Sequence, residues 1–335
     1  MGKILKIVFV IIGTLIGAGF ASGQEIYIFF YQYGMKGIFG IIISSILLGF
    51  VIYKVLSLCN KNKVTNYKSF LQVFIKHEKQ LEIFNTMMNI FILITFYIMI
   101  AGFGAYFEQQ FGIYSFIGSV ILAIICYFIF LNNVLGLIKV SQYVVPLLIA
   151  SLFIIGVFVI DVKNILEISR YVTENTSWKW ILDSILYGSY NTILLIPVLI
   201  ALRNLVKNKK QLWMISGVTT FFIIILSFIV FFMLTKVDVN IQNLEMPAVY
   251  VASKISPIFK YIYGFIILSS ILTTSISLGT SFLENVVYDK KKYKQYAIIL
   301  CVSSVLISYM GFSNLVNLLY PIFGYIGLIQ IIMIC

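Results

Sequence analysis

Seven long stretches of this sequence carry no charged residue, and they constrain the fold more than any other feature. They are residues 83–107, 109–138, 140–160, 184–202, 212–235, 261–283 and 295–335. A helix needs about 20 apolar residues to cross the hydrocarbon core of a bilayer. Only 11% of the residues are charged and 61% are hydrophobic, which is far outside the range of soluble domains. The sequence therefore predicts an all-α polytopic membrane protein.

These stretches predict ten membrane-spanning helices in a single domain, residues 1–335. The last stretch is long enough to cross twice, with its turn at Gly311–Asn314, and two further apolar runs precede residue 60. The expected spans are residues 4–33, 37–58, 83–107, 112–132, 139–160, 181–202, 211–235, 257–286, 295–310 and 314–334. Short helices are expected around Phe70–Ile75 and at Met246–Val251, the latter on the outer surface.

Ten spans divide into two halves of five, residues 4–160 and 181–334. An odd number of spans per half gives the halves opposite orientations, which is the condition for an inverted repeat.

The basic residues predict how the chain is oriented in the membrane. The net charge is +12, and alternating loops place 17 of the 24 lysines and arginines on the side of the N-terminus. Cytoplasmic loops carry the excess of Lys and Arg, so a cytoplasmic N-terminus in the cell membrane is expected, and nucleic-acid binding is not. A cleavable signal peptide at the N-terminus is the alternative, but apolar sequence resumes at Ile26–Tyr31.

Few residues suit a metal centre or covalent chemistry. The four cysteines form no CxxC pair, and the lone His77 lies among lysines in a predicted cytoplasmic loop. No cofactor is expected other than a coupling ion.

The first predicted span contains four glycines, Gly13, Gly17, Gly19 and Gly23. Glycine costs about 1 kcal/mol relative to alanine inside a helix, so this span is expected to break near residues 16–20 and to resume near Ala21. A break exposes N–H groups that can hold a carboxylate and carbonyls that can hold a cation such as Na⁺. Close packing between helices is the alternative, because the spacing also matches the small-xxx-small pattern.

The sixth predicted span has a similar polar interruption, Leu186-Tyr187-Gly188-Ser189-Tyr190-Asn191-Thr192, followed by Pro197. Interrupted helices at corresponding positions of two halves indicate a transporter binding site. The alternative is a packing glycine with side chains bonded to carbonyls of the previous turn.

The eighth predicted span carries eight hydroxyl side chains within residues 269–281. A single hydroxyl bonds to its own helix and indicates little, but eight form a face too polar for lipid. Thr273 and Thr274, with Ser270 one turn earlier, offer two hydroxyls and a carbonyl to a cation, and carbonyls of Gly13 and Ile16 would complete five oxygen ligands.

Glu25 is an acid with apolar sequence on both sides. Acids within membrane spans are rare and face a protein interior or a cavity. Glu25 could bind a substrate amine, relay a proton, form a buried hydrogen-bonded pair, or stabilise the N-terminus of the second half-helix.

The motifs of the first and eighth spans resemble those of the amino acid–polyamine–organocation (APC) superfamily, whose fold is exemplified by the bacterial leucine transporter. Gly13-x-x-Ile16-Gly17-x-Gly19 is similar to the unwound motif of that family's first helix, and Leu272-Thr273-Thr274-Ser275-Ile276 to its sodium-site motif. Among the sub-families the chain is most similar to the bacterial YkvI group. The resemblance implies a 5+5 inverted repeat in which helices one and six are broken.

The resemblance also implies site residues. Na⁺ would bind the carbonyls of Gly13, Ile16 and Ser270 and the hydroxyls of Thr273 and Thr274. The amides of residues 17–19 would hold a substrate carboxylate, with helix six closing the pocket. The full set expected at the substrate is Gly17, Ala18, Gly19, Phe20, Ser22, Glu25, Tyr187, Gly188, Ser189 and Asn191. Phe20 replaces the Asn that serves a second sodium in some relatives, so one cation site is expected.

These features predict a secondary transporter, not an enzyme: a Na⁺-coupled symporter of an amino acid or similar small zwitterion, working by alternating access. Coupling to H⁺ through Glu25, or a sensor of amino acids built on the same fold, would give the same sequence pattern. A channel would need a selectivity signature, and a membrane enzyme would need more polar residues at depth than Glu25 alone.

Overall fold

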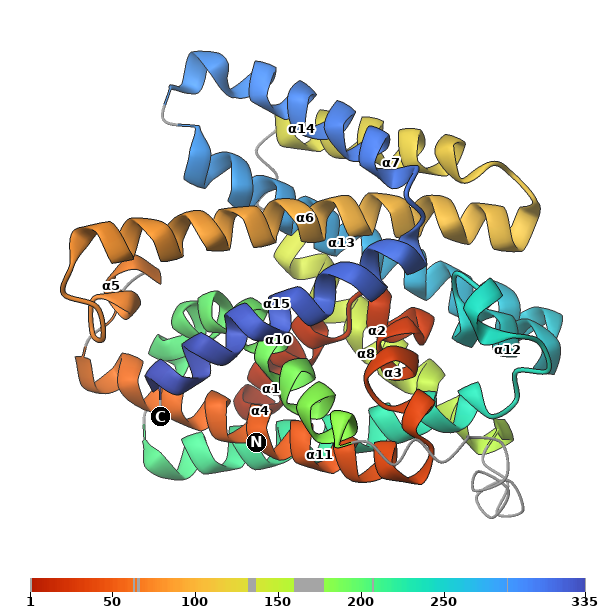
Figure 1. Ribbon diagram of the computed structural model, residues 1–335, viewed down its shortest axis with the longest axis horizontal. Coiled ribbons are helices and arrows are strands. Elements are labelled where there is room, and N and C mark those ends of the chain that lie inside the picture. The colour runs from red at the N-terminus through yellow and green to blue at the C-terminus, as the bar shows by residue number, and fades with distance from the viewer. Residues whose placement is uncertain are drawn as a thin grey trace.

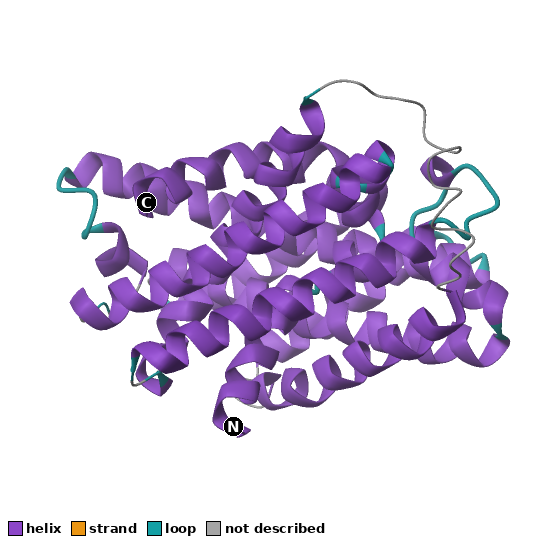
Figure 2. Ribbon diagram, turned by 90° about the horizontal axis from the view of Figure 1, so that it is seen from below, coloured by secondary structure: helices purple, strands orange, loops and turns teal. Residues whose placement is uncertain are grey.

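The protein is helical throughout the residues that its computed structural model describes, namely 2–62, 64, 67–131, 137–159, 178–206, 208–287 and 289–334 (Figure 2). No strand occurs within these ranges. The all-α membrane fold predicted from the sequence is confirmed.

Each predicted span corresponds to a helix, or to a series of helices in the case of the first. The first span comprises α1 (Gly2–Leu15), α2 (Ala18–Ser22) and α3 (Gln24–Phe29). The other nine are α4 (Met35–Asn62), α6 (Glu78–Phe111), α7 (Ser115–Leu131), α8 (Leu137–Val159), α10 (Lys179–Leu202), α11 (Lys209–Leu234), α13 (Pro257–Val286), α14 (Tyr293–Ser308) and α15 (Phe312–Ile334). The turn before α15 contains Gly311 at φ +82°, as the sequence predicts.

Within the described residues, six helices are long and apolar enough to cross a membrane: α4, α6, α10, α11, α13 and α15. Shorter apolar helices occupy the other four predicted positions. Two short helices lie in the loops, α5 (Tyr67–Leu71) and α12 (Pro247–Ile255), close to where they are predicted. Most of the predicted outer loop, residues 161–180, lies outside the described residues.

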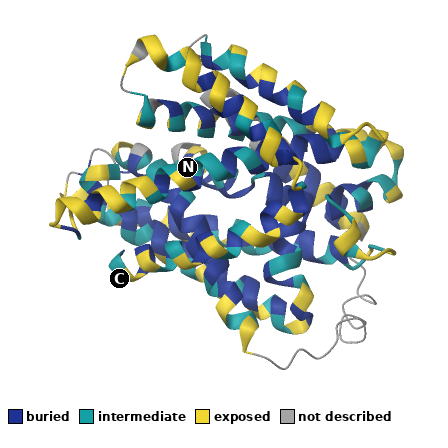
Figure 3. Cartoon of the chain, turned by 45° about the horizontal axis from the view of Figure 1, so that its top comes forward, coloured by how far each residue is buried: buried dark blue, intermediate teal, exposed yellow. Residues whose placement is uncertain are grey.

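The helices surround a centre formed by α1 and α10. Figure 1 shows these two crossed by α15 and flanked by α4 and α11, with α6 and α13 beyond them and α7 beside α14 at the edge. Buried residues are concentrated in this centre, and exposed residues cover the outer helices (Figure 3). The break in the first span therefore lies in the most enclosed part of the molecule.

Packing partners recur between the two halves of the chain. Numbering the spans of each half in order pairs each element of the first half with one of the second. The segment α1–α3 then pairs with α10, and the remaining pairs are α4 with α11, α6 with α13, α7 with α14, and α8 with α15. α1 packs on α8 and α11, and α10 correspondingly packs on α15 and α4. In the same way, the contact between α8 and α13 corresponds to the contact between α15 and α6. The contact between α7 and α13 corresponds to the contact between α14 and α6. Two equivalent halves would give this packing pattern.

Candidate functional site

The first span breaks where the glycines predict. α1 keeps its hydrogen-bond ladder up to the Ile16 N–H, which bonds the Ile12 carbonyl at 2.8 Å. The ladder resumes when the Ala21 N–H bonds the carbonyl of Gly17 at 3.0 Å, and Gly17 is extended, at φ −87° and ψ −170°. Between them, the N–H groups of residues 17–20 have no backbone acceptor within the described chain. The break is confirmed, although the next helix begins at Ala18 and not near Ala21.

A second break follows at Gly23, which the sequence analysis does not predict. Gly23 adopts φ +87°, a left-handed conformation that residues with a side chain rarely occupy, and its N–H bonds the Phe20 carbonyl at 3.0 Å. The Tyr263 hydroxyl of α13 donates to the freed Ala21 carbonyl at 2.5 Å. The sequence signal for this second break is Gly23 after Ser22, because a glycine in the left-handed conformation commonly ends a helix.

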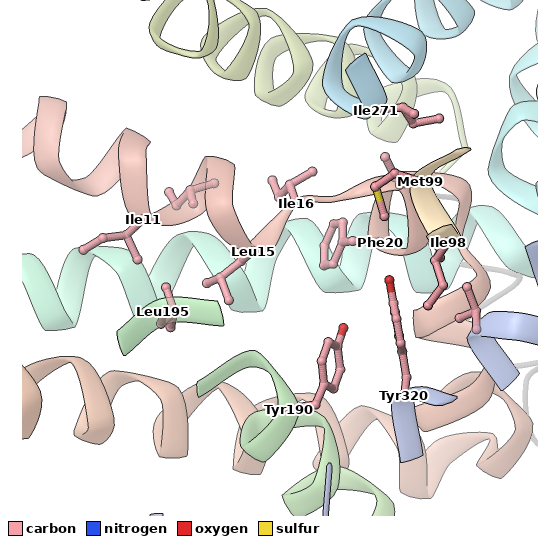
Figure 4. Close-up of a cluster of buried hydrophobic side chains, with 14 of the residues drawn as sticks. Ile11, Leu15, Ile16, Phe20, Ile98, Met99, Tyr190, Leu195, Ile271 and Tyr320 are labelled. Atoms are coloured by element: carbon pink, nitrogen blue, oxygen red, sulfur yellow. The ribbon is translucent and has the colours of Figure 1, made fainter. Parts of the chain in front are cut away.

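The cation side of the break joins α1 to α13. The buried Ser270 donates from its hydroxyl to the Ile16 carbonyl at 3.2 Å, and the Thr273 hydroxyl donates to the Ser270 carbonyl at 3.0 Å. Figure 4 shows Ile16 and Ile271 on this side of the broken helix. The Thr273 hydroxyl is equally close, at 3.0 Å, to the Ser269 carbonyl, so both of its acceptors lie in its own helix and the Ser270–Ile16 hydrogen bond is the one that joins α13 to the break among the expected Na⁺ ligands that the structure describes. No hydrogen bond within the described residues joins Gly13 or Thr274 to this group.

The other side of the break carries Glu25, which is only 3% exposed. It lies in the first turn of α3, and its side chain folds back over Gly19. The Tyr190 hydroxyl and the Phe20 N–H both donate to its carboxyl group. Of the roles considered for Glu25, the buried hydrogen-bonded pair is therefore present.

Aromatic rings surround this acid. Tyr190 is stacked between Phe29 and Tyr320, with ring centroids 5.6 Å and 4.8 Å away, and Tyr187 meets it edge-on at 5.5 Å. Tyr187, Tyr190 and Tyr320 all interact electrostatically with Glu25. In Figure 4, Tyr190 and Tyr320 point toward the segment that carries Phe20. Neither Tyr190 nor Tyr320 was predicted as a site residue.

The predicted break in the sixth span is wrong. α10 is one continuous helix, and the side chains of its polar stretch bond to carbonyls of the preceding turn. Ser189 bonds Ile185 at 2.7 Å, Asn191 bonds Tyr187 at 3.0 Å and Thr192 bonds Gly188 at 2.8 Å.

Within the polar stretch of α10, Gly188 is tightly packed, whereas Asn191 has an unsatisfied polar atom. Gly188 faces α4: a Cβ there would lie 2.9 Å from Leu47, so this glycine serves helix packing, as the alternative had it. Asn191 retains one buried oxygen, Oδ1, without a hydrogen-bond partner among the described residues.

The C-terminal part of the first span is anchored to the loop before α12. The Gln24 amide donates to the carbonyls of Leu244 and Glu245 at 2.5 and 3.2 Å. The Glu245 carboxylate accepts from the Ser313 N–H at 2.6 Å, so it caps the N-terminus of α15. Burial raises the pKa of Glu245 above its ordinary value. Ser22, expected near the substrate, instead bonds the Gly19 carbonyl at 2.9 Å.

Comparison with known proteins gives the family. No protein-family model matches the chain. The chain is 30% identical to the uncharacterised membrane protein YkvI of Bacillus subtilis (strain 168), over 98% of this chain and 94% of YkvI. The chain belongs to the YkvI family. The uncharacterised protein YyaD of the same organism is 23% identical, over 97% of this chain and 94% of YyaD.

Two solved transporters share the fold of this YkvI-family chain. A mutant of the manganese transporter of Eremococcus coleocola aligns with a TM-score of 0.62 at 13% identity, over 98% of this chain and 77% of its own. A Na⁺-coupled sialic acid symporter, in a substrate-bound outward-open state, aligns with a TM-score of 0.55 at 14% identity, over 98% of this chain and 76% of the symporter chain. At such identities the likeness shows a helical transporter fold alone.

Among the described residues, no group of three His, Cys, Asp or Glu side chains is placed to hold a metal ion.

Proposed function

We propose that the protein is a secondary active transporter of the cell membrane that couples Na⁺ entry to uptake of an amino acid or a related small amine. The observation that carries the proposal is the break in the first span, which lies at the enclosed centre of a transporter fold. Backbone groups left without partners at bilayer depth are tolerated where they line a binding site. Membership of the APC superfamily belongs to the same proposal.

The helix packing supports alternating access between two inverted repeats, residues 4–160 and 181–334. The helices exchange partners between halves, as equivalent repeats would require. Transporters built this way rock one part of the molecule against another around a fixed midplane site. The excess of basic residues on one side supports a cytoplasmic N-terminus.

The proposed Na⁺ site uses the Ile16 carbonyl, the Ser270 carbonyl and the Thr273 hydroxyl, with Gly13 and Thr274 as the remaining ligands. The hydrogen bond from the Ser270 hydroxyl to the Ile16 carbonyl supports this assignment, since it joins the two helices that would supply the ligands. Unwound carbonyls and half-helix ends are the groups that coordinate Na⁺ in transporters with broken helices.

Coupling to H⁺ is a second candidate, and the burial of Glu25 favours it. Glu25 has two hydrogen-bond donors and no ion pair within the described residues. A carboxylate so enclosed needs either a bound cation or a proton. Acids at membrane depth often mark proton relays in transporters.

Uptake by proteoliposomes tests the coupling ion. The substrate probe is a mixture of radiolabelled amino acids and the amines formed by their decarboxylation, offered under a Na⁺ gradient or, separately, a pH gradient. Thr273→Val is expected to weaken the apparent Na⁺ affinity at least tenfold, about 1.4 kcal/mol, because it removes one ligand oxygen. Ser275→Ala is the matched control, since it removes a hydroxyl of the same helix that is not among the proposed ligands and that bonds the Ile271 carbonyl at 2.7 Å.

Two results would decide against Na⁺ coupling. Uptake that follows the pH gradient and ignores Na⁺ would assign coupling to Glu25. Equal Na⁺ dependence in Thr273→Val and wild type would exclude the proposed ligands.

A further inference from the structure

A groove opens at the end of the bundle where α6 begins and α15 ends. It has a volume of about 560 Å³ and lies between the turn after α5, the first two turns of α6 and the last two turns of α15. Phe74, Ile83, Phe84, Ile329 and Met333 line it. In Figure 1, α5 and the start of α6 lie at the same end of the bundle as the end of α15. None of these residues belongs to the break in the first span, so the groove is a separate site.

The position of the groove along α6 and α15 places it at the membrane surface. α6 has 34 residues, about 51 Å at 1.5 Å per residue, and is longer than the hydrocarbon core, which is about 30 Å thick. α15 has 23 residues, enough to cross, so its last turns lie at the edge of the core. Ile83 and Ile329 at the rim are 58% and 46% exposed. Because both belong to helices long and apolar enough to span, they face lipid, and the groove opens toward acyl chains.

Two lysines without acidic partners lie at the edge of the groove. Lys76 directly follows the turn that lines it, and Lys79 lines a second hollow that shares Ile83 with it. Both lysines are exposed, and neither forms an ion pair within the described part of the chain. Glu82 lines the second hollow, but no acid among the described residues lines the groove itself. The edge therefore offers ammonium groups to an anion beside an apolar hollow.

The start of α6 lies at the same edge. Its first hydrogen bond runs from the Leu81 N–H to the His77 carbonyl at 3.1 Å, so the N–H groups of residues 78–80 have no backbone acceptor within the described chain. The side chain of His77 makes no capping bond. Helix N-termini attract phosphate through such N–H groups and the helix dipole, and Glu78 in the first turn offsets only part of this attraction. Residues 76–80 thus bring two ammonium groups and three N–H groups to the edge of the groove.

We propose that this groove binds one anionic phospholipid, with an acyl chain against Phe84 and Met333 and the phosphate at Lys76, Lys79 and the start of α6. A phospholipid joins the two chemistries that the site offers, an apolar hollow and an anion-binding edge, at the depth where both meet. Basic pockets between membrane helices bind anionic head groups in this way. A zwitterionic phospholipid would bring its own ammonium to the lysines, so the site prefers the anionic one. The inference goes beyond the proposed function and does not depend on the transported substrate.

Binding by the purified full-length protein, stripped of lipid in a neutral detergent, tests the proposal. The probes are phosphatidylglycerol and phosphatidylcholine with identical acyl chains, and glycerol 3-phosphate as the head group alone. Native mass spectrometry counts the bound lipid, and thermal unfolding measures the stabilisation that binding gives. We expect one phosphatidylglycerol to bind about fivefold more tightly than phosphatidylcholine, since a lysine near the membrane surface contributes about that factor. Glycerol 3-phosphate at the same concentration should not stabilise the protein.

The head-group contact is tested by Lys76→Gln combined with Lys79→Gln. Both positions are exposed, so folding should be retained, and the preference for phosphatidylglycerol should disappear. Lys209→Gln combined with Lys210→Gln is the matched control. It removes the same charge from two exposed residues at the start of α11, on the same predicted side of the membrane, and should leave the preference unchanged.

The acyl-chain contact is tested by Ile83→Gln, which puts a polar side chain at the rim of the groove. Both phospholipids should bind severalfold more weakly, while phosphatidylglycerol remains the preferred one. Ile298→Gln is the matched control, since Ile298 is 46% exposed and lies, like Ile83, in the second turn of its helix. It should bind both lipids as the wild type does.

Four outcomes would overturn the inference. Equal affinity of the wild type for the two phospholipids would remove the head-group preference, and an unchanged preference without Lys76 and Lys79 would remove its assigned origin. An equal loss in the Lys209 and Lys210 control would mean a diffuse surface effect. Stabilisation by glycerol 3-phosphate alone, with lipid binding unchanged in Ile83→Gln, would mean a site for soluble anions outside the groove.

Discussion

The segment α1–α3 and the helix α10 begin the two halves of the chain with similar sequences and different structures. Each carries glycine and polar side chains in mid-span, yet the first breaks twice and the second is continuous. In α10, residues 189, 191 and 192 bond carbonyls of their own helix, so no backbone group is released. In α1–α3, the partners of the released groups come from other elements.

The difference shows what makes a membrane helix break. Glycine content lowers the cost of leaving the helix, but the broken state also needs outside partners for the freed carbonyls and N–H groups. Ser270 and Tyr263 of α13 supply hydroxyls to Ile16 and Ala21, and Glu25 supplies a carboxylate to Phe20. The α10 stretch has one glycine, so leaving the helix would cost it more than it costs the first span.

The largest effect is expected where α10 serves packing. In Gly327→Ala, the new Cβ would collide with the Ser189 carbonyl of α10 and lie 3.0 Å from the Tyr190 nitrogen. Backbone cannot yield as a side chain tip can, so the free energy of unfolding should fall by about 1–3 kcal/mol, the usual range for overpacking. Reversible unfolding in mixed micelles measures it. Gly217→Ala on α11, with nothing within 4 Å of its Cβ, is the matched control, and an equal loss there would refute the packing explanation.

A smaller effect, of another kind, is expected in the broken segment. In Gly19→Ala the three atoms nearest the new Cβ all belong to the Glu25 side chain, so this side chain, and not backbone, would have to move. Stability should change by less than about 1 kcal/mol, whereas ligand affinity falls about tenfold because the carboxylate is displaced. Titration with the amino acids and amines used for the uptake measurement, and unfolding of the same sample, separate the two quantities. A loss of stability as large as that of Gly327→Ala would mean that Gly19 serves packing too.

The smallest effect is expected for Thr192→Val in α10. The Thr192 hydroxyl bonds only the Gly188 carbonyl, and hydrogen bonds within membrane proteins contribute about 0.6 kcal/mol on average. Uptake and apparent Na⁺ affinity should match wild type, in contrast to Thr273→Val. A clear change in either would bring α10 into the coupling mechanism.

The sequence predicts the helices well, because charge-free runs and loop charges report membrane insertion directly. The spans agree with the described helices to within a few residues, and the glycines locate the first break. The break in helix six was predicted by analogy between halves, and it is wrong: this stretch has one glycine where the first span has four, and its Ser189, Asn191 and Thr192 side chains bond carbonyls of their own helix.

The partners of Glu25 could not be found in the same way. Tyr190 lies 165 residues from Glu25 in the chain, and Tyr320 reaches the site from α15. Tyrosines are common in this sequence, 22 in all, so neither stands out until the helices are packed. The binding roles expected of all the predicted Na⁺ and substrate residues stay predictions.

The close approach of Glu25 to Gly19 also links two positions in the history of the family. The Gly19 backbone has no room for a side chain while a glutamate lies over it, so neither position is free to drift alone. A relative that acquires alanine at position 19 is expected to carry a shorter residue at position 25, and a relative with a small residue there can dispense with the glycine. Sequences that differ at both positions would then differ together in what they bind.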